Sequence, residues 1–220
     1  TLFSVVLASL LPGLFWLWYF NRYDIFDKEP LAKLGQCLLF GALVVLVALA
    51  WEAPFGKLLQ TTNSLVVQLV LSFFVVGLGE EFFKLLATYL AVAQSPEFNE
   101  PMDGIVYAIA TSIGFSVIEN IFYISSFGLT IAPLRGTIAT LAHIAFSGLA
   151  GSYLGKAKFS PRPKYELLKG LTLASFLHGL YDFLLITHIA SPVVLVLFIL
   201  ALHYWLLHGI RQALGSSPLS

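Results

Sequence analysis

The sequence predicts an all-α protein, a polytopic transmembrane helix bundle of about seven spans that forms one membrane-embedded domain over residues 1–220. Composition is the first reason: 58% of the residues are hydrophobic, 11% are charged and the formal net charge is zero. Soluble domains do not have this balance. The second reason is that apolar stretches of ~20 residues, long enough to cross a bilayer as helices, recur along the chain. The segments that join them are too short to hold a separate soluble domain.

The expected spans follow one another closely. They cover residues 2–20, 34–51, 65–93, 104–127, 137–155, 168–188 and 193–210. The first has no basic segment before it and no small-residue cleavage site, so we expect a retained span rather than a signal peptide.

Basic residues are unevenly distributed among the loops. Cytoplasmic loops of membrane proteins are enriched in lysine and arginine. The distribution therefore predicts that the N-terminus lies outside and the C-terminus in the cytoplasm. Arg22, Lys28 and Lys33 follow the first span, and Lys156, Lys158, Arg162, Lys164 and Lys169 follow the fifth, whereas the alternate loops hold Lys57 and Arg135.

Four consecutive spans carry polar side chains at positions expected to lie inside the membrane. A charge at the centre of a span costs roughly 2.5–3.5 kcal/mol, and such residues usually mark function. We therefore expect these groups to face one another in one site. They are Glu80, Glu81 and Lys84 on the third span, Glu119 and Asn120 on the fourth, His143 on the fifth, and His178 and Asp182 on the sixth.

Helix geometry separates the roles of the two adjacent glutamates. At about 100° per residue, Lys84 lies roughly 40° around the helix from Glu80 and roughly 60° the other way from Glu81. The lysine should therefore sit between two carboxylates that point in different directions. We expect one glutamate to reach the reacting atom and the other to pair with Lys84 or a neighbouring helix.

Small residues recur at four-residue spacing on the fourth and fifth spans, which allows helices in lipid to approach closely. This spacing also predicts that His143 points inward. On the sixth span Asp182 follows His178 by one helical turn, so its carboxylate can accept from the ring and fix the tautomer. The stripes are Gly104, Ala108, Ser112, Ser116 and Asn120 on the fourth span, and His143, Ser147, Gly151 and Gly155 on the fifth.

The charges of the expected site do not balance. Glu80, Glu81, Glu119 and Asp182 outnumber Lys84 if the histidines are neutral. A dry site then needs a divalent cation or bound protons. A metal held by imidazole and carboxylate, with an open position, would make hydroxide available. Alternatively, a desolvated glutamate could act as general base on a water held by the histidines. Both routes remain open at this point.

Other interpretations explain less of the pattern. A buried Glu80–Lys84 salt bridge that only joins helices would be a poor source of stability and leaves Glu81 unexplained. Ser147 could pair with His178 in a serine-type protease, but the glutamates would then be idle. Cys37 is alone and predicts neither a disulfide nor a thiolate metal site. A proton- or cation-coupled transporter could use the same carboxylates and histidines, although the repeats and broken helices common in transporters are not evident.

Four motifs, in order on successive spans, resemble the PrsW family of intramembrane proteases, which is similar in turn to the CAAX prenyl-protease and bacteriocin-processing superfamily. The resemblance runs from the first loop to the sixth span. The motifs are Glu80-Glu81-x-x-Lys84, Phe115-x-x-x-Glu119-Asn120, His143, and His178-Gly179-Leu180-Tyr181-Asp182.

The resemblance implies an intramembrane endopeptidase that hydrolyses a peptide bond of a membrane-anchored protein, such as an anti-sigma factor at first-site cleavage. The implied location is a prokaryotic cytoplasmic membrane, and the implied partners are the substrate and the bilayer, with no nucleic acid. PrsW-like proteins are usually described as metalloproteases, whereas relatives in the superfamily are thought to use glutamate and histidines alone.

Roles for the site residues follow from the same resemblance. Glu80 and Glu81 would activate water, and Lys84 would balance charge. His143 and His178 would hold the water or a metal, Glu119 would be a further ligand or acid, and Asp182 would orient His178. If a metal is bound, we expect zinc, with Glu81, Glu119, His143 and His178 as ligands.

Overall fold

The computed structural model describes residues 1–219, residue 60 by its backbone alone, and this part of the chain is helical without any strand. The predicted all-α fold is therefore confirmed. Two 3₁₀ segments, η1 (Ala53–Phe55) and η3 (Leu129–Ile131), and two π-helical segments, η2 (Leu71–Gly77) and η4 (Arg135–Ala139), interrupt the α-helices. The α-helices are α1 (Leu2–Asn21), α2 (Leu31–Glu52), α3 (Gly56–Thr61), α4 (Leu65–Val70), α5 (Leu78–Val92), α6 (Pro101–Phe127), α7 (Ala132–Leu134), α8 (Thr140–Phe159), α9 (Pro163–Ile186) and α10 (Pro192–Gly215).

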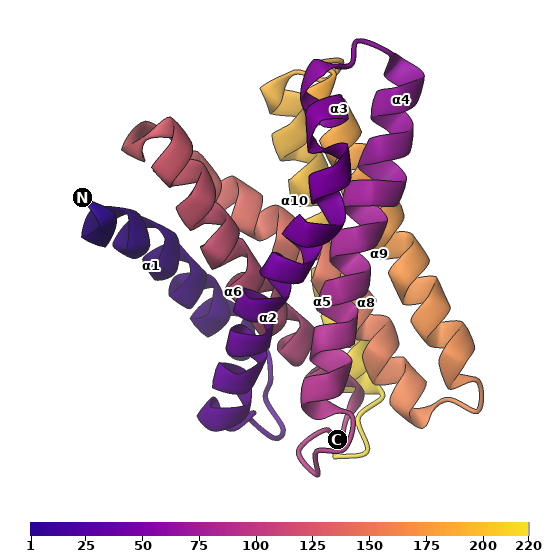
Figure 1. Ribbon diagram of the computed structural model, residues 1–220. Coiled ribbons are helices and arrows are strands. Elements are labelled where there is room, and N and C mark those ends of the chain that lie inside the picture. Colours follow the sequence, from indigo (N-terminus) through magenta and orange to yellow (C-terminus); the bar gives the residue numbers. More distant parts are fainter. Residues whose placement is uncertain (220) are drawn as a thin grey trace.

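The long helices run up and down through one bundle (Figure 1). The C-terminus lies at the same end as the α1–α2 loop, and the N-terminus lies toward the other end. Six helical stretches are long and apolar enough to cross a membrane. The α9 helix has 24 residues but is more polar, because it carries Lys169, His178 and Asp182. The seventh span and the orientation of the termini stay predictions.

The α6 and α8 helices form the buried centre of the bundle. In α6, 72% of the membrane-length stretch is buried, against 17% in α1. Glycines allow the two central helices to touch through their backbones: a Cβ on Gly104 would lie 2.4 Å from the nitrogen of Gly155, and a Cβ on Gly151 would lie 2.4 Å from the oxygen of Gly104. The predicted close approach of these two spans is confirmed.

A π-helical segment, η2, leads directly into α5. Its backbone also meets α9, because a Cβ on Gly77 would lie 2.6 Å from the oxygen of Ser175 and 2.7 Å from the nitrogen of Gly179. On the other side, Trp51 of α2 donates from Nε1 to the carbonyl oxygen of Val75 at 3.0 Å. Short π-helical segments are frequent at functional sites. Here the segment places the first turn of α5 against α9 and α2.

Candidate active site

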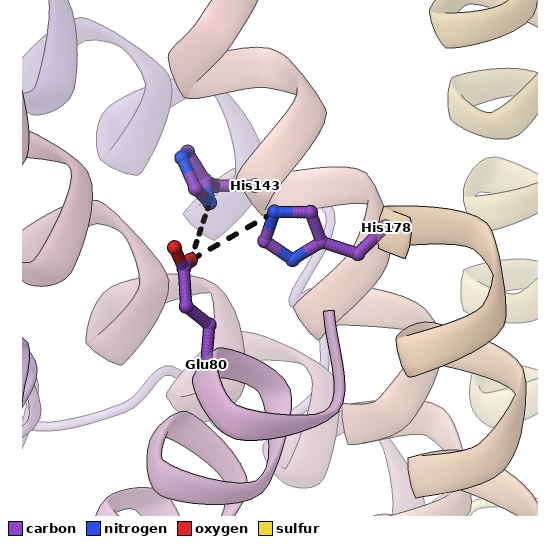
Figure 2. A group of neighbouring side chains, drawn as sticks. All are labelled: Glu80, His143 and His178. Atoms are coloured by element: carbon purple, nitrogen blue, oxygen red, sulfur yellow. Dashed lines mark ion pairs between the residues drawn. The ribbon is translucent and has the colours of Figure 1, made fainter. Parts of the chain in front are cut away.

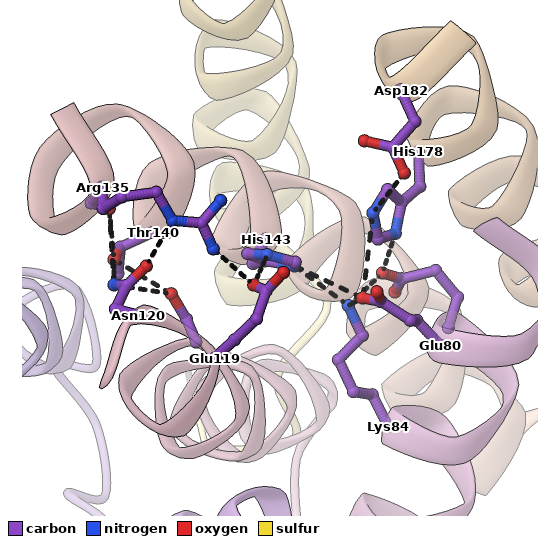
Figure 3. A network of polar contacts seen from close by, with 11 residues as sticks. Glu80, Lys84, Glu119, Asn120, Arg135, Thr140, His143, His178 and Asp182 are labelled. Atoms are coloured by element: carbon purple, nitrogen blue, oxygen red, sulfur yellow. Dashed lines mark hydrogen bonds and ion pairs between the residues drawn. The ribbon is translucent and has the colours of Figure 1, made fainter. Parts of the chain in front are cut away.

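Polar side chains from α5, α6, α8 and α9 meet in one network inside the bundle (Figure 3). The network borders a cavity of about 230 Å³ that α2 closes with the apolar side chains of Val45, Ala48 and Leu49. Five of the seven predicted site residues line this cavity, namely Glu80, Glu119, His143, His178 and Asp182. The other two, Glu81 and Lys84, are buried next to them.

The ammonium group of Lys84 lies between the two adjacent glutamates, as predicted. Its Nζ is 2.5 Å from Oε1 of Glu81 and 3.4 Å from Oε2 of Glu80. It also lies 3.2 Å from Nδ1 of His143 and 4.7 Å from the centre of the Phe115 ring. Lys84 is 1% exposed, so its charge is balanced by protein groups rather than by water.

Glu81 is completely buried and fixes the ring of His178. Its Oε1 lies 2.9 Å from Nδ1 of His178, and its Oε2 accepts from the hydroxyl of Ser147 at 2.9 Å. An ionised carboxylate only accepts hydrogen bonds, so Nδ1 carries a proton. The lone pair of the neutral imidazole is then on Nε2. Because Ser147 donates to Glu81, the serine-type alternative receives no support here.

The Nε2 atom of His178 faces the carboxylates of Glu80 and Asp182. The distances are 3.8 Å to Oε2 of Glu80 and 3.4 Å to Oδ2 of Asp182. The ring of Phe146 stacks on the imidazole with a centroid separation of 4.8 Å. The sequence predicts that Asp182 orients this ring, and the structure adds Glu81 as the closer carboxylate, 2.9 Å from the opposite ring nitrogen. Asp182 lies on the cavity side.

His143 is held by a carboxylate in the same way as His178, but the roles of its two ring nitrogens are exchanged. Its Nε2 lies 2.8 Å from Oε2 of Glu119, so Nε2 carries the proton and Nδ1 holds the lone pair of the neutral ring. Nδ1 faces Glu80 at 3.8 Å and the ammonium group of Lys84. Each histidine therefore has a carboxylate behind it, and its acceptor nitrogen points toward Glu80.

Arg135 holds Glu119 in place from η4. One guanidinium nitrogen lies 2.9 Å from Oε2 of Glu119, and Nε donates to Oδ1 of Asn120 at 2.9 Å. The guanidinium group lies over the Tyr123 ring, 3.9 Å from its centre. Asn120 in turn donates to the hydroxyl of Thr140 at 3.1 Å. These contacts give Glu119 a fixed position beside His143.

Glu80, His143 and His178 form a group that fits a metal ion. Their three ligand atoms lie within 4.8 Å of one another, and all three side chains are buried. Figure 2 shows the carboxylate of Glu80 turned toward both rings. Two histidines and one carboxylate, each histidine backed by a second carboxylate, are the donor set typical of catalytic zinc sites.

This group differs from the ligand set expected from the sequence. Glu81 contacts Nδ1 of His178, and Glu119 contacts Nε2 of His143; we call these the outer nitrogens. Glu80 is the carboxylate that faces the other nitrogen of each ring, which we call the inner nitrogen. Adjacent residues on a helix point about 100° apart, so Glu80 and Glu81 cannot both face the cavity. The structure thus supports the expectation that they have different roles.

Sequence reasoning missed three polar residues that line the cavity, namely Glu52, Tyr123 and Arg135. The sequence position of Arg135 indicates only a loop charge, but one of its guanidinium nitrogens lies 2.9 Å from Oε2 of Glu119. Glu52, at the end of α2, and Tyr123, one turn after Glu119 on α6, also line the cavity. Tyr123 follows Glu119 by four residues, and this helical spacing indicates that both side chains lie on the same face of the helix. The position of Arg135 depends on tertiary packing.

Comparison with known proteins gives the family. The family model described as "PrsW family intramembrane metalloprotease" matches residues 29–207. The protein named Protease PrsW from Geobacillus kaustophilus is 35% identical over 216 residues, which are 97% of this chain and 94% of that protein. Protease PrsW from Oceanobacillus iheyensis is 34% identical over 206 residues, covering 91% and 94%. Protease PrsW from Bacillus subtilis is 31% identical over 215 residues, covering 96% and 95%. No solved structure matches the chain significantly.

The family match includes every helix that contributes to the network, since it begins in the α1–α2 loop and ends in α10. The prediction of an intramembrane protease is therefore confirmed. The comparisons give no support to the transporter alternative. This membrane-embedded protease belongs to the PrsW family of intramembrane metalloproteases.

Proposed function

We propose that this protease cleaves a single-span, membrane-anchored protein of the anti-sigma-factor class in the cytoplasmic membrane of a bacterium, with a zinc ion held by Glu80, His143 and His178. The substrate class follows the family resemblance, and the bacterial relatives support the location. The observation that carries the site assignment is the orientation of the two histidines. Glu119 and Glu81 each accept a hydrogen bond from the outer N–H of one ring, so both inner nitrogens keep a lone pair and face Glu80.

The donor set suits zinc better than magnesium or calcium, which prefer oxygen ligands. Bound to these residues, zinc would polarise the scissile carbonyl and make hydroxide available near neutral pH. Lys84 keeps a partner of its own in Glu81, at 2.5 Å, so its charge is balanced independently of Glu80.

Hydrolysis adds the oxygen of water to the carbonyl carbon and leaves a proton on the departing amine nitrogen. Glu80 faces both His143 Nδ1 and His178 Nε2 at 3.8 Å and borders the cavity, so a water bound to the metal would lie beside its carboxylate. Asp182 also lines the cavity and lies 3.4 Å from His178, where it can accept a proton from water or return one to the leaving amine. Glu81 does not border the cavity, and we assign it as a positioning residue for His178 and Lys84.

The cavity wall suits an apolar substrate segment. Val45, Ala48 and Leu49 of α2 form one side of it, and the polar network forms the other. A transmembrane substrate helix offers apolar side chains to the first surface, and an unwound peptide group can present its carbonyl to the second. Cleavage should therefore occur within or just beside the substrate's membrane span.

The test is co-expression with a tagged single-span anti-sigma factor and detection of the membrane-retained fragment. We expect Glu80→Gln to abolish the fragment, because the substitution is nearly isosteric and removes only the carboxylate chemistry. Glu97→Gln in the α5–α6 loop is the matched control and should cleave normally. Full cleavage by Glu80→Gln would refute the assigned role. Cleavage of another single-span protein but not the anti-sigma factor would refute only the substrate class.

A further inference from the structure

A second group of carboxylates is buried at the end of the bundle that holds the α1–α2 loop. Asp24 and Glu29 belong to that loop, and Glu100 and Asp103 to the start of α6. Their exposed fractions are 0%, 5%, 0% and 1%. The two segments are in direct contact, because Asn99 donates to Asp27 at 3.1 Å and Tyr107 donates to Glu29. We refer to Asp24, Glu29, Glu100 and Asp103 as the acidic end cluster.

The acidic end cluster has no basic partner among the described residues. Every ion pair within 4.0 Å in residues 1–219 belongs to the active-site network. One oxygen of Asp103 accepts from the backbone N–H groups of Asn99 and Glu100 at 2.6 and 2.7 Å, which caps α6. No N–H or hydroxyl group donates to its other oxygen or to Oε1 of Glu29, and the two carboxyl groups contact each other instead. Buried carboxylates in this state need a counter-charge or protons.

Asp24 is the strongest indication of a ligand. The side chain is 0% exposed, and neither carboxylate oxygen makes a well-formed hydrogen bond. Its charge interacts with the rest of the cluster: burial, and then the charges of Glu100 and Asp103, raise its pKa to about 7, while the backbone N–H of Glu29 opposes this rise. Burial and the charge of Asp103 raise the pKa of Glu29 to about 10. The two loop carboxylates are thus destabilised as anions by each other and by α6.

The acidic end cluster is separate from the active site. Asp103 and Glu119 lie on the same helix, and at ~1.5 Å rise per residue they are roughly 24 Å apart. The donor chemistry also differs, because the cluster offers oxygen atoms and no imidazole. Within the described residues, only the Glu80 group places three ligand atoms within 4.8 Å of one another. Because the four carboxylates do not form such a compact group, they suit an ion that keeps water molecules among its ligands, as Mg²⁺ and Ca²⁺ do.

We propose that Asp24, Glu29, Glu100 and Asp103 form a second cation site, for a partly hydrated Mg²⁺ or Ca²⁺ ion, that ties the α1–α2 loop to the start of α6. The ion neutralises carboxylates that the fold buries without a basic residue. It also joins two segments that are far apart in the sequence, the α1–α2 loop and the start of α6. The α6 helix carries Glu119 in its second half. The site is structural and does not depend on the proposed substrate or on zinc.

The test is thermal unfolding of the full chain in detergent after removal of metals with EDTA, followed by addition of excess MgCl₂, CaCl₂ or MnCl₂. Saturation of a site that exists only in the folded state should raise the wild-type midpoint by about 5–10 °C at a hundredfold excess over the dissociation constant. Asp24→Asn should abolish this rise, whereas Glu97→Gln, in the α5–α6 loop outside the cluster, should keep it. Metal-free Asp24→Asn should be at least as stable as metal-free wild type, because it no longer buries an unpaired anion.

A count of bound ions provides a second readout that does not depend on stability. Mn²⁺ binding followed by electron paramagnetic resonance, in a Glu80→Gln background that disables the active-site group, should fall by one ion per chain when Asp24→Asn is added. Glu100→Gln serves if the Asp24 variant does not fold. The proposal is overturned if none of the three ions raises the wild-type midpoint, or if Asp24→Asn responds like wild type. A metal-free Asp24→Asn protein well below wild type in stability would also overturn it, since that result assigns Asp24 a hydrogen-bonding role instead.

Discussion

Replacing Gly41 of α2 with alanine should separate the two helices that enclose the cavity. A Cβ at this position would lie 1.9 Å from the carbonyl oxygen of Thr111 on α6, whereas ordinary contact begins near 3.4 Å. The backbones must therefore move apart by about 1.5 Å, because the opposing atom is main chain and cannot rotate away. Overpacking of this kind typically costs ~1–3 kcal/mol. For a chain of this size we expect a midpoint lower by roughly 3–10 °C.

The same helix offers a matched control. Nothing lies within 4 Å of a Cβ built at Gly35, which is exposed on α2. Gly35→Ala should be neutral or stabilising by up to ~1 kcal/mol, because alanine favours the helix more than glycine does. Thermal unfolding of both variants in the same detergent measures the difference, and cleavage should fall only in Gly41→Ala. Equal midpoints for the two variants would refute the close α2–α6 contact.

Three further predictions follow from the buried charges. Glu81→Gln should abolish cleavage and also lower stability by ~3–5 kcal/mol, because it leaves the ammonium group of Lys84 poorly paired. Glu80→Gln should abolish cleavage with a much smaller change in the unfolding midpoint, and equal midpoints for the two variants would contradict their separate roles. Arg135→Lys should retain more cleavage than Arg135→Ala but less than wild type, since lysine keeps a charge near Glu119 but cannot contact Glu119 and Asn120 at the same time. Equal cleavage rates for all three proteins would exclude a positioning role for Arg135. In EDTA, stability should fall as pH rises, because the pKa of Asp24 is raised from 3.8 to about 7. Its contribution is complete below about pH 4 and is lost through about pH 7; the full shift corresponds to about 4 kcal/mol, and solvent screening makes the measured loss smaller. A profile that Asp24→Asn leaves unchanged would refute this assignment.

Much of the site could be predicted because charged side chains in a membrane-spanning helix face the interior of the bundle and pair with one another. The structure brings all seven predicted site residues into one network of ion pairs and hydrogen bonds. They are Glu80, Glu81, Lys84, Glu119, His143, His178 and Asp182. The position of Lys84 between two carboxylates followed from helical angles alone. The glycine stripes of α6 and α8 likewise reported a close approach that the backbone contacts confirm.

The partners of individual atoms could not be predicted in the same way. Whether Glu81 or Asp182 orients His178 depends on the rotation of α5, which the π-helical segment η2 and its contact with α9 determine. Arg135 reaches Glu119 because η4 turns back over α6, and no local pattern indicates this. The buried carboxylates of the α1–α2 loop were likewise not anticipated, since loop acids are usually solvated. Their burial follows from contact with the start of α6.

We propose that Glu80, His143 and His178 hold the metal with which this protease cleaves its substrate. This proposal is tested most directly by measuring zinc content and cleavage together on the same purified protein, before and after chelation. We predict about one zinc per chain in the Glu80 group, loss of zinc and cleavage in parallel on chelation, recovery of both on adding zinc, and low zinc content in His178→Ala. Full cleavage by protein stripped of metal would contradict the claim, and would assign the chemistry to Glu80 and the two histidines alone.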